Sequence, residues 1–382
     1  MYRALVNGRI LGTDGVVRRR TVLVHGTTID AVQDPAAPIP AGATINDLHD
    51  HLLLPGFIDT QVNGGGGVLF NDAPTVEGIA AIGRAHLQFG TTGFLPTLIS
   101  DDLEVIGRAI EAVNAAIAAG VPGVLGIHIE GPFINPRRKG IHDAQRIRAL
   151  DADVLPLLQS LRGGKMLLTI APECTPPELL RALSDAGVIL AAGHSEATCE
   201  QIEVALQQGL RGFTHLFNAM SPLTSRAPGV VGAALLDRYS WCGIIVDGHH
   251  VDPRTLRVAL AAKAHERFML VTDAMPCVGT DLASFDLHGK TIHVRDGYCI
   301  DDTGTLAGTA LNMARAVHNA VELLNLPIAD AARMASEYPA EFLGLGTSHG
   351  RIDAGYRADF VVADNALRVI EVWQDGQRRS PN

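Results

Sequence analysis

Residues 124–135 read Val-Leu-Gly-Ile-His-Ile-Glu-Gly-Pro-Phe-Ile-Asn, a short apolar run that ends at a carboxylate followed by Gly-Pro. The run is too short for a helix and Gly131-Pro132 ends it, so it predicts a buried parallel strand. Because side chains alternate along a strand, His128 and Glu130 lie on one face near its carboxyl end. A buried carboxylate needs a cation or hydrogen bonds to compensate it. The stretch therefore predicts either a structural acid in the core or a strand that delivers Glu130 to a functional site.

Strand-like and helix-like segments alternate on both sides of this stretch. Eight strands alternating with helices over about 250 residues predict a (β/α)8 TIM barrel, with a doubly wound parallel sheet as the alternative. The predicted strands are 56–61, 93–98, 124–130, 166–171, 188–192, 212–216, 243–246 and 268–272. The predicted helices are 76–88, 103–118, 152–161, 177–186, 199–209 and 253–264, followed by a hairpin at 286–300 and closing helices at 311–324 and 329–343.

The sequence pattern at the two ends of the chain differs from the pattern in the middle. Short β-like runs separated by turn signals fill residues 1–53, and similar runs recur near the C-terminus, with Asp375-Gly376 as a hairpin signal. We therefore expect residues 1–53 and 350–382 to form one small β-sandwich domain built from both termini, and residues 54–349 to form the barrel domain.

Length and composition limit the classes of protein that the chain can belong to. Its 382 residues suit one large barrel with an accessory domain. The formal net charge is −10 and the basic run Arg18-Arg19-Arg20 is short, so nucleic acid and anionic membranes are poor candidate partners. The five cysteines show no Cys-x-x-Cys spacing, and we find neither a signal peptide nor a stretch approaching 18 uninterrupted apolar residues. We expect a cytoplasmic protein.

Polar residues recur where the predicted strands end. A barrel brings the carboxyl ends of its strands to one face, where enzymes of this fold build their active sites. One carboxylate and two imidazoles are the ligands of a catalytic zinc-like site with an open position for water. Each residue alone has a structural explanation, such as a hydrogen-bonded histidine or a helix-capping acid, but together they predict a metal site. The residues at the strand ends are Gln61, Asn63, Glu130, His194, His215, His249, His250 and Asp273.

Several of these segments resemble the amidohydrolase superfamily, namely Leu-Pro-Gly-Phe-Ile-Asp at 54–59, the glutamate of the third strand, the histidines of strands five and six, and the aspartate of strand eight. More narrowly, the chain resembles the N-acetylglucosamine-6-phosphate deacetylase family from about residue 50 onward. That resemblance rests on Gln-Val-Asn-Gly at 61–64, His-Ile-Glu-Gly-Pro-Phe at 128–133, Gly-His-Ser at 193–195, His-Leu-Phe-Asn-Ala-Met at 215–220, Asp-Gly-His-His-Val-Asp at 247–252, Val-Thr-Asp-Ala at 271–274 and Leu-Ala-Gly at 306–308.

The resemblance implies hydrolysis of N-acetyl-D-glucosamine 6-phosphate to D-glucosamine 6-phosphate and acetate, in amino sugar catabolism or recycling. It implies that Asp273 is the general base, which takes a proton from water and passes it to the leaving nitrogen. The same resemblance makes Glu130, His194 and His215 ligands of one divalent ion. Zn²⁺ is the expected ion, and Fe²⁺, Co²⁺ and Mn²⁺ are alternatives that tolerate this ligand set.

The first strand departs from the superfamily pattern. Many members carry His-x-His there and use it to hold a second metal, whereas this chain has Gln61 and Asn63. Two amides are poor replacements for two imidazoles, so these residues mark a possible vestigial metal site. We expect the single-metal branch of the family.

The resemblance also implies the substrate contacts. Arg226 and His250 match phosphate contacts of the family, and the Asn218-Ala219 turn offers backbone donors. In the family the arginine comes from the neighbouring subunit, so we expect a homodimer in which Arg226 reaches the neighbouring active site. His142 matches a substrate-contacting histidine, whose target is either the carbonyl or a sugar hydroxyl. The segment that is expected to close over the sugar, in the loop after the hairpin, consists of Leu306, Ala307 and Gly308.

Three other interpretations stay open. A related amidohydrolase acting on N-acetylgalactosamine 6-phosphate or another amide would use the same metal chemistry, because specificity lies in the loops. A non-catalytic barrel would have little need for the metal ligands and Asp273 together. A metal-free barrel enzyme that binds phosphate near the last strands would be insensitive to chelators. The sequence decides neither the metal in the cell nor the sugar epimer.

Overall fold

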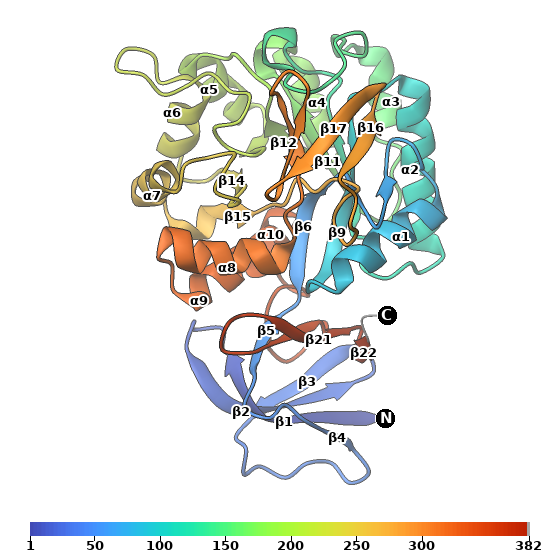
Figure 1. The fold of residues 1–382 in the computed structure, drawn as a ribbon, viewed down its shortest axis with the longest axis vertical. Coiled ribbons are helices and arrows are strands. Elements are labelled where there is room, and N and C mark those ends of the chain that lie inside the picture. The colour runs from blue at the N-terminus through green and yellow to red at the C-terminus, as the bar shows by residue number, and fades with distance from the viewer. Residues whose placement is uncertain (380–382) are drawn as a thin grey trace.

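The computed structural model describes residues 1–379, which form a helix-covered barrel joined to a smaller β-sheet (Figure 1). The barrel sheet is parallel, with the strand order β15-β14-β13-β12-β11-β10-β9-β6. Its strands are β6 Phe57–Val62, β9 Thr91–Ile99, β10 Gly126–Glu130, β11 Lys165–Ile170, β12 Ile189–Ala192, β13 Leu210–Phe213, β14 Trp241–Ile244 and β15 Phe268–Leu270. Every predicted barrel strand is present, which confirms the (β/α)8 prediction.

Helices cover the outside of this barrel (Figure 1). None of them, within residues 1–379, combines the length and apolar character needed to cross a membrane. The α-helices are α1 Val76–Leu87, α2 Leu103–Ala118, α3 Leu155–Leu158, α4 Pro177–Asp185, α5 Cys199–Gln207, α6 Gly229–Leu236, α7 Pro253–Ala262, α8 Met313–Leu324, α9 Ile328–Met334 and α10 Glu337–Phe342. The 3-10 turns are η1 Pro136–Arg138, η2 Ala152–Val154, η3 Pro172–Cys174 and η4 His265–Arg267.

Three helix predictions differ from the structure. The predicted helix 152–161 ends at Leu158, where the Ser160 hydroxyl donates to the Leu157 carbonyl at 2.7 Å and competes with the helical bonds. The predicted helix 329–343 is split into α9 and α10, because Pro339 cannot continue a helix interior but is tolerated in the first turn of a new one. Helix α6 was not predicted, since its sequence Gly-Val-Val-Gly-Ala-Ala-Leu-Leu has no polar face to give helical periodicity.

The barrel closes between its first and last strands. Across this seam the Asp273 amide donates to the Gln61 carbonyl at 3.0 Å. The Asp59 carboxylate, which is completely buried, accepts the Thr272 hydroxyl at 2.5 Å. Because burial outweighs these bonds, the pKa of Asp59 is raised to about 7. The seam therefore fixes Asp273 relative to Gln61.

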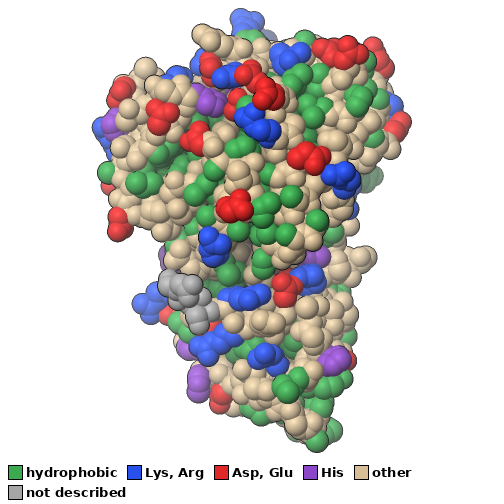
Figure 2. All heavy atoms as spheres, turned by 90° about the vertical axis from the view of Figure 1, so that its right-hand side faces the viewer, with side chains coloured by type: hydrophobic (Ala, Val, Ile, Leu, Met, Phe, Trp, Pro, Cys, Tyr) green, Lys and Arg blue, Asp and Glu red, His purple; other side chains and the backbone are tan. Residues whose placement is uncertain are grey.

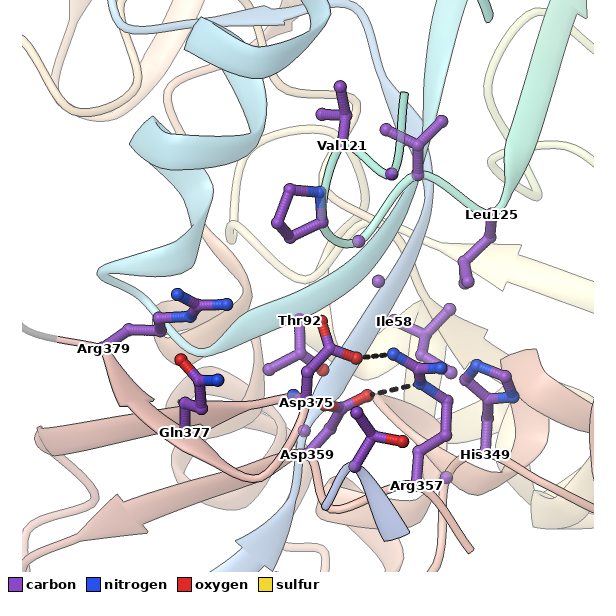
Figure 3. Close-up of a pocket in the computed structure, with 18 residues that line it drawn as sticks. Ile58, Thr92, Val121, Leu125, His349, Arg357, Asp359, Asp375, Gln377 and Arg379 are labelled. Carbon is purple, nitrogen blue, oxygen red and sulfur yellow. Dashed lines mark hydrogen bonds and ion pairs between the residues drawn. The ribbon is translucent and has the colours of Figure 1, made fainter. Parts of the chain in front are cut away.

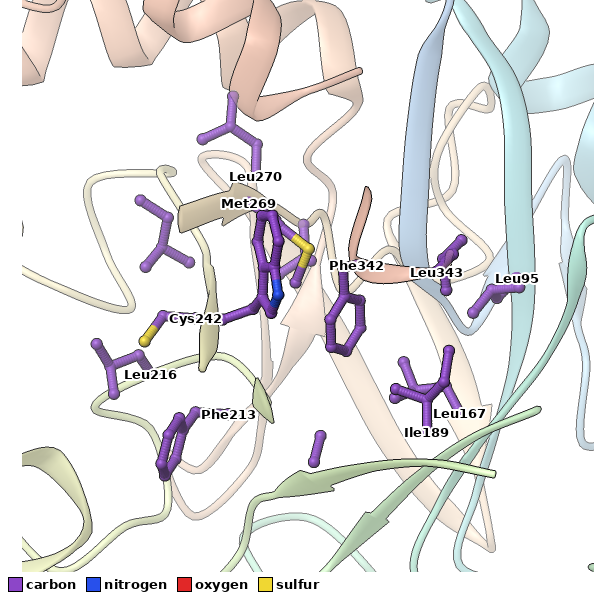
Figure 4. Close-up of a cluster of buried hydrophobic side chains, with 14 of the residues drawn as sticks. Leu95, Leu167, Ile189, Phe213, Leu216, Cys242, Met269, Leu270, Phe342 and Leu343 are labelled. Carbon is purple, nitrogen blue, oxygen red and sulfur yellow. The ribbon is translucent and has the colours of Figure 1, made fainter. Parts of the chain in front are cut away.

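Buried apolar side chains cluster in the barrel (Figure 4). Phe342 of α10 is 2% exposed and its ring centroid lies 6.2 Å from that of Trp241 on β14. Met269 and Phe213 belong to the same cluster and are also buried. Complete burial of each large side chain contributes about 1.5–3 kcal/mol. This core makes the barrel a rigid scaffold for the residues at its carboxyl end.

The smaller sheet combines both ends of the chain, with the order β22-β21-β20-β5-β1-β2-β3 and β4 paired to β1. It has its own core around Trp373, which is 0% exposed. The predicted domain division at residues 53 and 350 stays a prediction, and residues 380–382 of the predicted C-terminal part lie outside the described residues. The strands are β1 Tyr2–Leu11, β2 Val17–His25, β3 Thr28–Gln33, β4 Thr44–Asp47, β5 Leu52–Pro55, β20 Phe360–Ala363, β21 Val369–Gln374 and β22 Gln377–Arg379.

A third, four-stranded antiparallel sheet follows the last barrel strand. The predicted hairpin 286–300 is its centre, but the segment 306–308, predicted as a loop, lies on a strand. The reason is pairing: Ile300 faces Leu306, and the Thr309 amide donates to the Asp273 carbonyl at 2.9 Å. The strands are β16 Ser284–Leu287, β17 Lys290–Arg295, β18 Tyr298–Asp301 and β19 Leu306–Thr309, and a separate short hairpin pairs β7 Gly64–Gly65 with β8 Val68–Leu69.

A cavity of about 520 Å³ lies between the barrel and the smaller sheet (Figure 3). Arg357 points into it and pairs with Asp359, at 3.4 Å, and with Asp375. Burial raises the pKa of Asp359 to about 6, although Arg357 acts in the opposite direction. None of the predicted site residues lines this cavity. On the face in Figure 2, acidic side chains lie mainly over the barrel, and basic ones gather along the waist beside the smaller sheet.

Candidate active site

Three predicted metal ligands converge at the carboxyl end of the barrel. Glu130 ends β10, while His194 and His215 lie just beyond β12 and β13. The Glu130 Oε1 atom is 3.2 Å from His194 Nε2 and 2.9 Å from His215 Nε2, and the two nitrogens are 3.1 Å apart. The side chains of all three residues are buried. The barrel therefore brings together residues that are up to 85 positions apart in the sequence.

The donor and acceptor roles of these atoms show whether a cation fits. His194 Nδ1 lies 2.9 Å from the Arg138 carbonyl, which only accepts, so Nδ1 carries the proton and Nε2 presents a lone pair. The Glu130 carboxylate also only accepts. Burial alone would raise its pKa, but the neighbouring imidazoles of His194 and His215 hold that pKa well below the usual range. A single proton can form a hydrogen bond within only one of the three close atom pairs, and the other two pairs then have no donor. The set therefore fits a divalent cation.

Backbone strain marks the same positions. His194, His215 and Asp273 have φ values of +50°, +31° and +52°, in the left-handed region that non-glycine residues rarely adopt. Each follows the end of a barrel strand, where the chain turns sharply. Such strain costs on the order of 1–3 kcal/mol per residue and clusters at functional sites. It aims the three side chains toward one point.

Asp273 lies beside the ligand set and is held by two amides. Asn63 Nδ2 donates to Asp273 Oδ1 at 2.6 Å. Gln61 Nε2 lies 3.2 Å from the same oxygen and 3.1 Å from Glu130 Oε1. Burial and the nearby Glu130 charge raise the pKa of Asp273, and the hydrogen bond from Asn63 opposes that rise. A buried acid with a raised pKa is suited to proton transfer.

His142 presents a hydrogen-bond donor to the site. Its Nδ1 accepts the Ser100 amide at 3.4 Å and lies 2.7 Å from the Ser100 hydroxyl. Burial and the neighbouring imidazole of His194 hold its pKa well below the usual value, so the ring is neutral and carries its proton on Nε2. The ring lies 4.5 Å from that of His194, measured between centroids.

These groups surround a pocket of about 450 Å³. Of the predicted site residues, three do not line it. Gln61 bonds to the lining residues Glu130 and Asp273, the ring of His249 lies against Tyr298, and Arg226 is exposed on the loop before α6. The sequence prediction missed Arg137 and Arg138, although the basic run Arg-Arg-Lys at 137–139 was a visible signal. The predicted residues that line the pocket are Asn63, Glu130, His142, His194, His215, Asn218, Ala219, His250, Asp273, Leu306, Ala307 and Gly308.

A parallel barrel that gathers a glutamate, two histidines and a second acid at its carboxyl end belongs to the class of metal-dependent TIM-barrel hydrolases. Comparison with known proteins is more specific. The sequence profile of the amidohydrolase family matches residues 52–379, so the chain belongs to the amidohydrolase family. Its relatives place it in the branch of that family that contains the amino sugar 6-phosphate deacetylases, as the sequence motifs predict.

Two curated relatives and one solved structure support this placement. The chain is 45% identical over 328 residues to an N-acetylgalactosamine-6-phosphate deacetylase of Shewanella sp., covering 85% of this chain and 82% of that protein. It is 36% identical over 380 residues to an N-acetylglucosamine-6-phosphate deacetylase of Haemophilus influenzae, with 99% of both chains covered. The crystal structure of N-acetylglucosamine-6-phosphate deacetylase from Pasteurella multocida superposes with a TM-score of 0.95 at 34% identity, covering 100% of both chains.

Proposed function

We propose that this protein hydrolyses N-acetyl-D-glucosamine 6-phosphate to D-glucosamine 6-phosphate and acetate, in amino sugar catabolism or recycling. The observation that carries the proposal is the buried, converging set of Glu130, His194 and His215 with Asp273 beside it. The named relatives in Haemophilus influenzae and Pasteurella multocida support the choice of substrate.

The proposed cofactor is one divalent ion per chain, Zn²⁺ in preference to Fe²⁺, Co²⁺ or Mn²⁺, held by Glu130, His194 and His215. When bound, such an ion lowers the pKa of a coordinated water from about 15.7 to about 7 and so supplies hydroxide at neutral pH. Gln61 and Asn63 occupy the position that other family members use for a second metal, and their amides are already bonded to carboxylates. This supports a single-metal site.

Asp273 is the proposed proton carrier. Because Asn63 and Gln61 both lie against Oδ1, Oδ2 is the carboxylate oxygen left to take the proton of the attacking water. The same oxygen then delivers that proton to the substrate nitrogen, which cannot leave as an amine without it. We assign the Nε2–H of His142 to the substrate carbonyl, where a fixed neutral donor stabilises the developing negative charge.

The phosphate is proposed to lie near His250 and the Asn218-Ala219 turn, which line the other side of the pocket. We infer a homodimer in which Arg226 completes the neighbouring site, as expected from the family. Support comes from the position of Arg226, which is exposed and lines no part of its own pocket. Leu223 and Tyr239, on the same side of the barrel near α6, are 55% and 79% exposed, which suits a contact with a second subunit.

A cytoplasmic location is also proposed. All five cysteines are free thiols, and four of them are buried. Cys277 and Cys299 remain unlinked although their sulfur atoms are 3.7 Å apart. Unlinked neighbouring thiols suit a reducing compartment.

The second candidate substrate is N-acetylgalactosamine 6-phosphate. The observation that favours it is the 45% identity to the Shewanella enzyme, which exceeds the 36% identity to the Haemophilus enzyme. The two sugars differ only in the orientation of one hydroxyl, so the metal set and Asp273 would serve both.

The decisive experiment is acetate release from each epimer by the purified protein, before and after chelation and with Zn²⁺ restored. Activity that disappears with the chelator and returns with the metal supports the proposal, and the ratio of kcat/KM values decides between the epimers. No acetate from either sugar phosphate, with Zn²⁺ bound to the protein, would overturn it.

A further inference from the structure

Asp247 and His250 form a buried pair at the edge of the pocket. Both lie in the turn between β14 and α7, and their side chains are 3% and 5% exposed. Asp247 Oδ2 is 2.6 Å from His250 Nδ1. The other carboxylate oxygen accepts the backbone amides of His249, at 2.8 Å, and His250, at 2.9 Å. Asp247 therefore orients both the ring of His250 and the backbone that carries it.

This arrangement determines which ring nitrogen faces the pocket. A carboxylate accepts hydrogen bonds, so His250 Nδ1 carries a proton and Nε2 is the nitrogen left for a ligand. Burial alone would raise the pKa of Asp247, but the bond from His250 outweighs it and lowers that pKa, so the carboxylate stays charged. The carboxylate therefore holds the ring by its Nδ1 edge and leaves the Nε2 edge for the pocket.

Neighbouring elements hold the turn in place. Asn319 of α8 donates to the Val246 carbonyl at 2.7 Å. The ring of His249 lies against Tyr298 of β18, with 4.5 Å between the centroids. Gly248 has a φ of +81°, which permits the tight turn between Asp247 and the two histidines. With the backbone anchored on both sides, the direction of the His250 ring depends on its bond to Asp247.

We propose that Asp247 is a positioning residue for phosphate recognition, which fixes the ring of His250 with Nε2 toward the bound phosphate. The inference rests on the proposed function, in which the substrate is an amino sugar phosphate. His250 is the group that touches the anion, and Asp247 acts only through it.

The test compares two Asp→Asn substitutions in the same turn. Asp247→Asn keeps the shape of the side chain but removes its charge. Asp252→Asn is the matched control: Asp252 caps α7 by accepting the Arg254 amide at 2.8 Å, and its side chain is 44% exposed. We expect Asp247→Asn to raise KM for the phosphorylated substrate about 10-fold, the size of one charged hydrogen bond, with a much smaller change in kcat. Asp252→Asn should lower the melting temperature and leave KM unchanged.

Two further measurements separate positioning from a general structural role. The unphosphorylated sugar should show the same kcat/KM with wild type and Asp247→Asn, since it has no anion for His250 to bind. In a His250→Asn background, Asp247→Asn should have no further effect on KM, because its partner is already gone.

The outcomes are distinct. Equal losses on phosphorylated and unphosphorylated sugars, or additive effects in the double variant, would show that Asp247 is merely structural. An unchanged KM in a folded Asp247→Asn protein would overturn the inference while the proposed function stands. Failure of the metal-loaded wild type to release acetate would overturn the proposed function itself.

Discussion

The two ends of the barrel carry cavities of similar size and opposite character. The cavity against the smaller sheet has a volume of about 520 Å³ and the pocket at the carboxyl end about 450 Å³. In the first, Arg357 is paired with two carboxylates of the same chain. In the second, Glu130 lies against two imidazole nitrogens, and that of His194 also accepts. Volume therefore does not distinguish the functional end, whereas the convergence of a buried carboxylate and two imidazoles does.

The backbone also differs between the two ends. Beside the larger cavity most positive φ values fall on glycines such as Gly120 and Gly123, at +69° and +81°, which glycine adopts without strain, although Asp375 in a hairpin turn has a φ of +56°. At the carboxyl end His194 and Asp273 have positive φ values at a cost in free energy. Non-glycine residues with positive φ also occur in turns elsewhere, so what marks the carboxyl end is that His194, His215 and Asp273 all adopt this conformation around one pocket.

The largest expected effect comes from removing the carboxylate shared by the ligand set. Glu130→Ala should lose the bound metal and reduce acetate release to background, because two imidazoles alone hold a divalent ion weakly. Bound metal is measured by elemental analysis of the purified variant. The control at the opposite end of the barrel is Asp359→Ala. This substitution removes a buried carboxylate that contacts none of the three proposed metal ligands, so the variant should keep its metal. A fully metallated, active Glu130→Ala protein would show that the ligand assignment is wrong.

Asp273→Asn should be the next most damaging change. We expect metal content near that of wild type and a fall in kcat by a factor on the order of 10² or more, because the proton carrier is lost. The measurement is acetate release at saturating substrate, with metal analysis of the same sample. A near-normal kcat would show that Asp273 is not the proton carrier. The two ends of the barrel would then differ in function only through the proposed metal ligands.

Arg226→Ala should have a smaller and selective effect. KM for the phosphorylated sugar should rise about 10-fold, since a charged hydrogen bond to phosphate is lost, while an unphosphorylated analogue should be hydrolysed as before. Steady-state kinetics on both substrates provide the test. If this substitution impaired both substrates equally, Arg226 would have no specific role toward phosphate.

The smallest effect on turnover is expected from substituting Asp359 at the opposite cavity. There the substitution should change the pH dependence of stability instead. The folded-state pKa of Asp359 is raised from 3.8 to about 6, so the folded protein binds this proton more tightly than the unfolded chain. Its contribution to stability is therefore greatest at low pH and is lost as the pH rises from about 4 to about 6, by at most about 3 kcal/mol. Denaturant unfolding of wild type and Asp359→Asn across this range should show the difference, with unchanged kcat. Parallel stability profiles would contradict it.

The barrel and the convergence of Glu130, His194 and His215 were predictable because each strand carries its own signal. A short apolar run ending in Glu130 or preceding His194 marks both the strand and its carboxyl end. The partners of those residues were not predictable in this way. The Arg138 carbonyl that fixes the His194 tautomer is a backbone group with no side-chain signal. Likewise, the pairing of Arg357 with Asp375 depends on how the last strands meet, which local periodicity does not encode.

Strand β5 lies between β1 and β20, so a single sheet contains strands from both ends of the chain. Only Gly56 separates this strand from β6, the first strand of the barrel. A pulling force applied to the two chain ends is therefore borne first by the hydrogen bonds of the smaller sheet, before any barrel strand is loaded. Fraying that starts at a chain terminus would likewise reach this sheet before the barrel. The smaller sheet therefore lies mechanically between the chain termini and the barrel, whose carboxyl end carries the candidate active site.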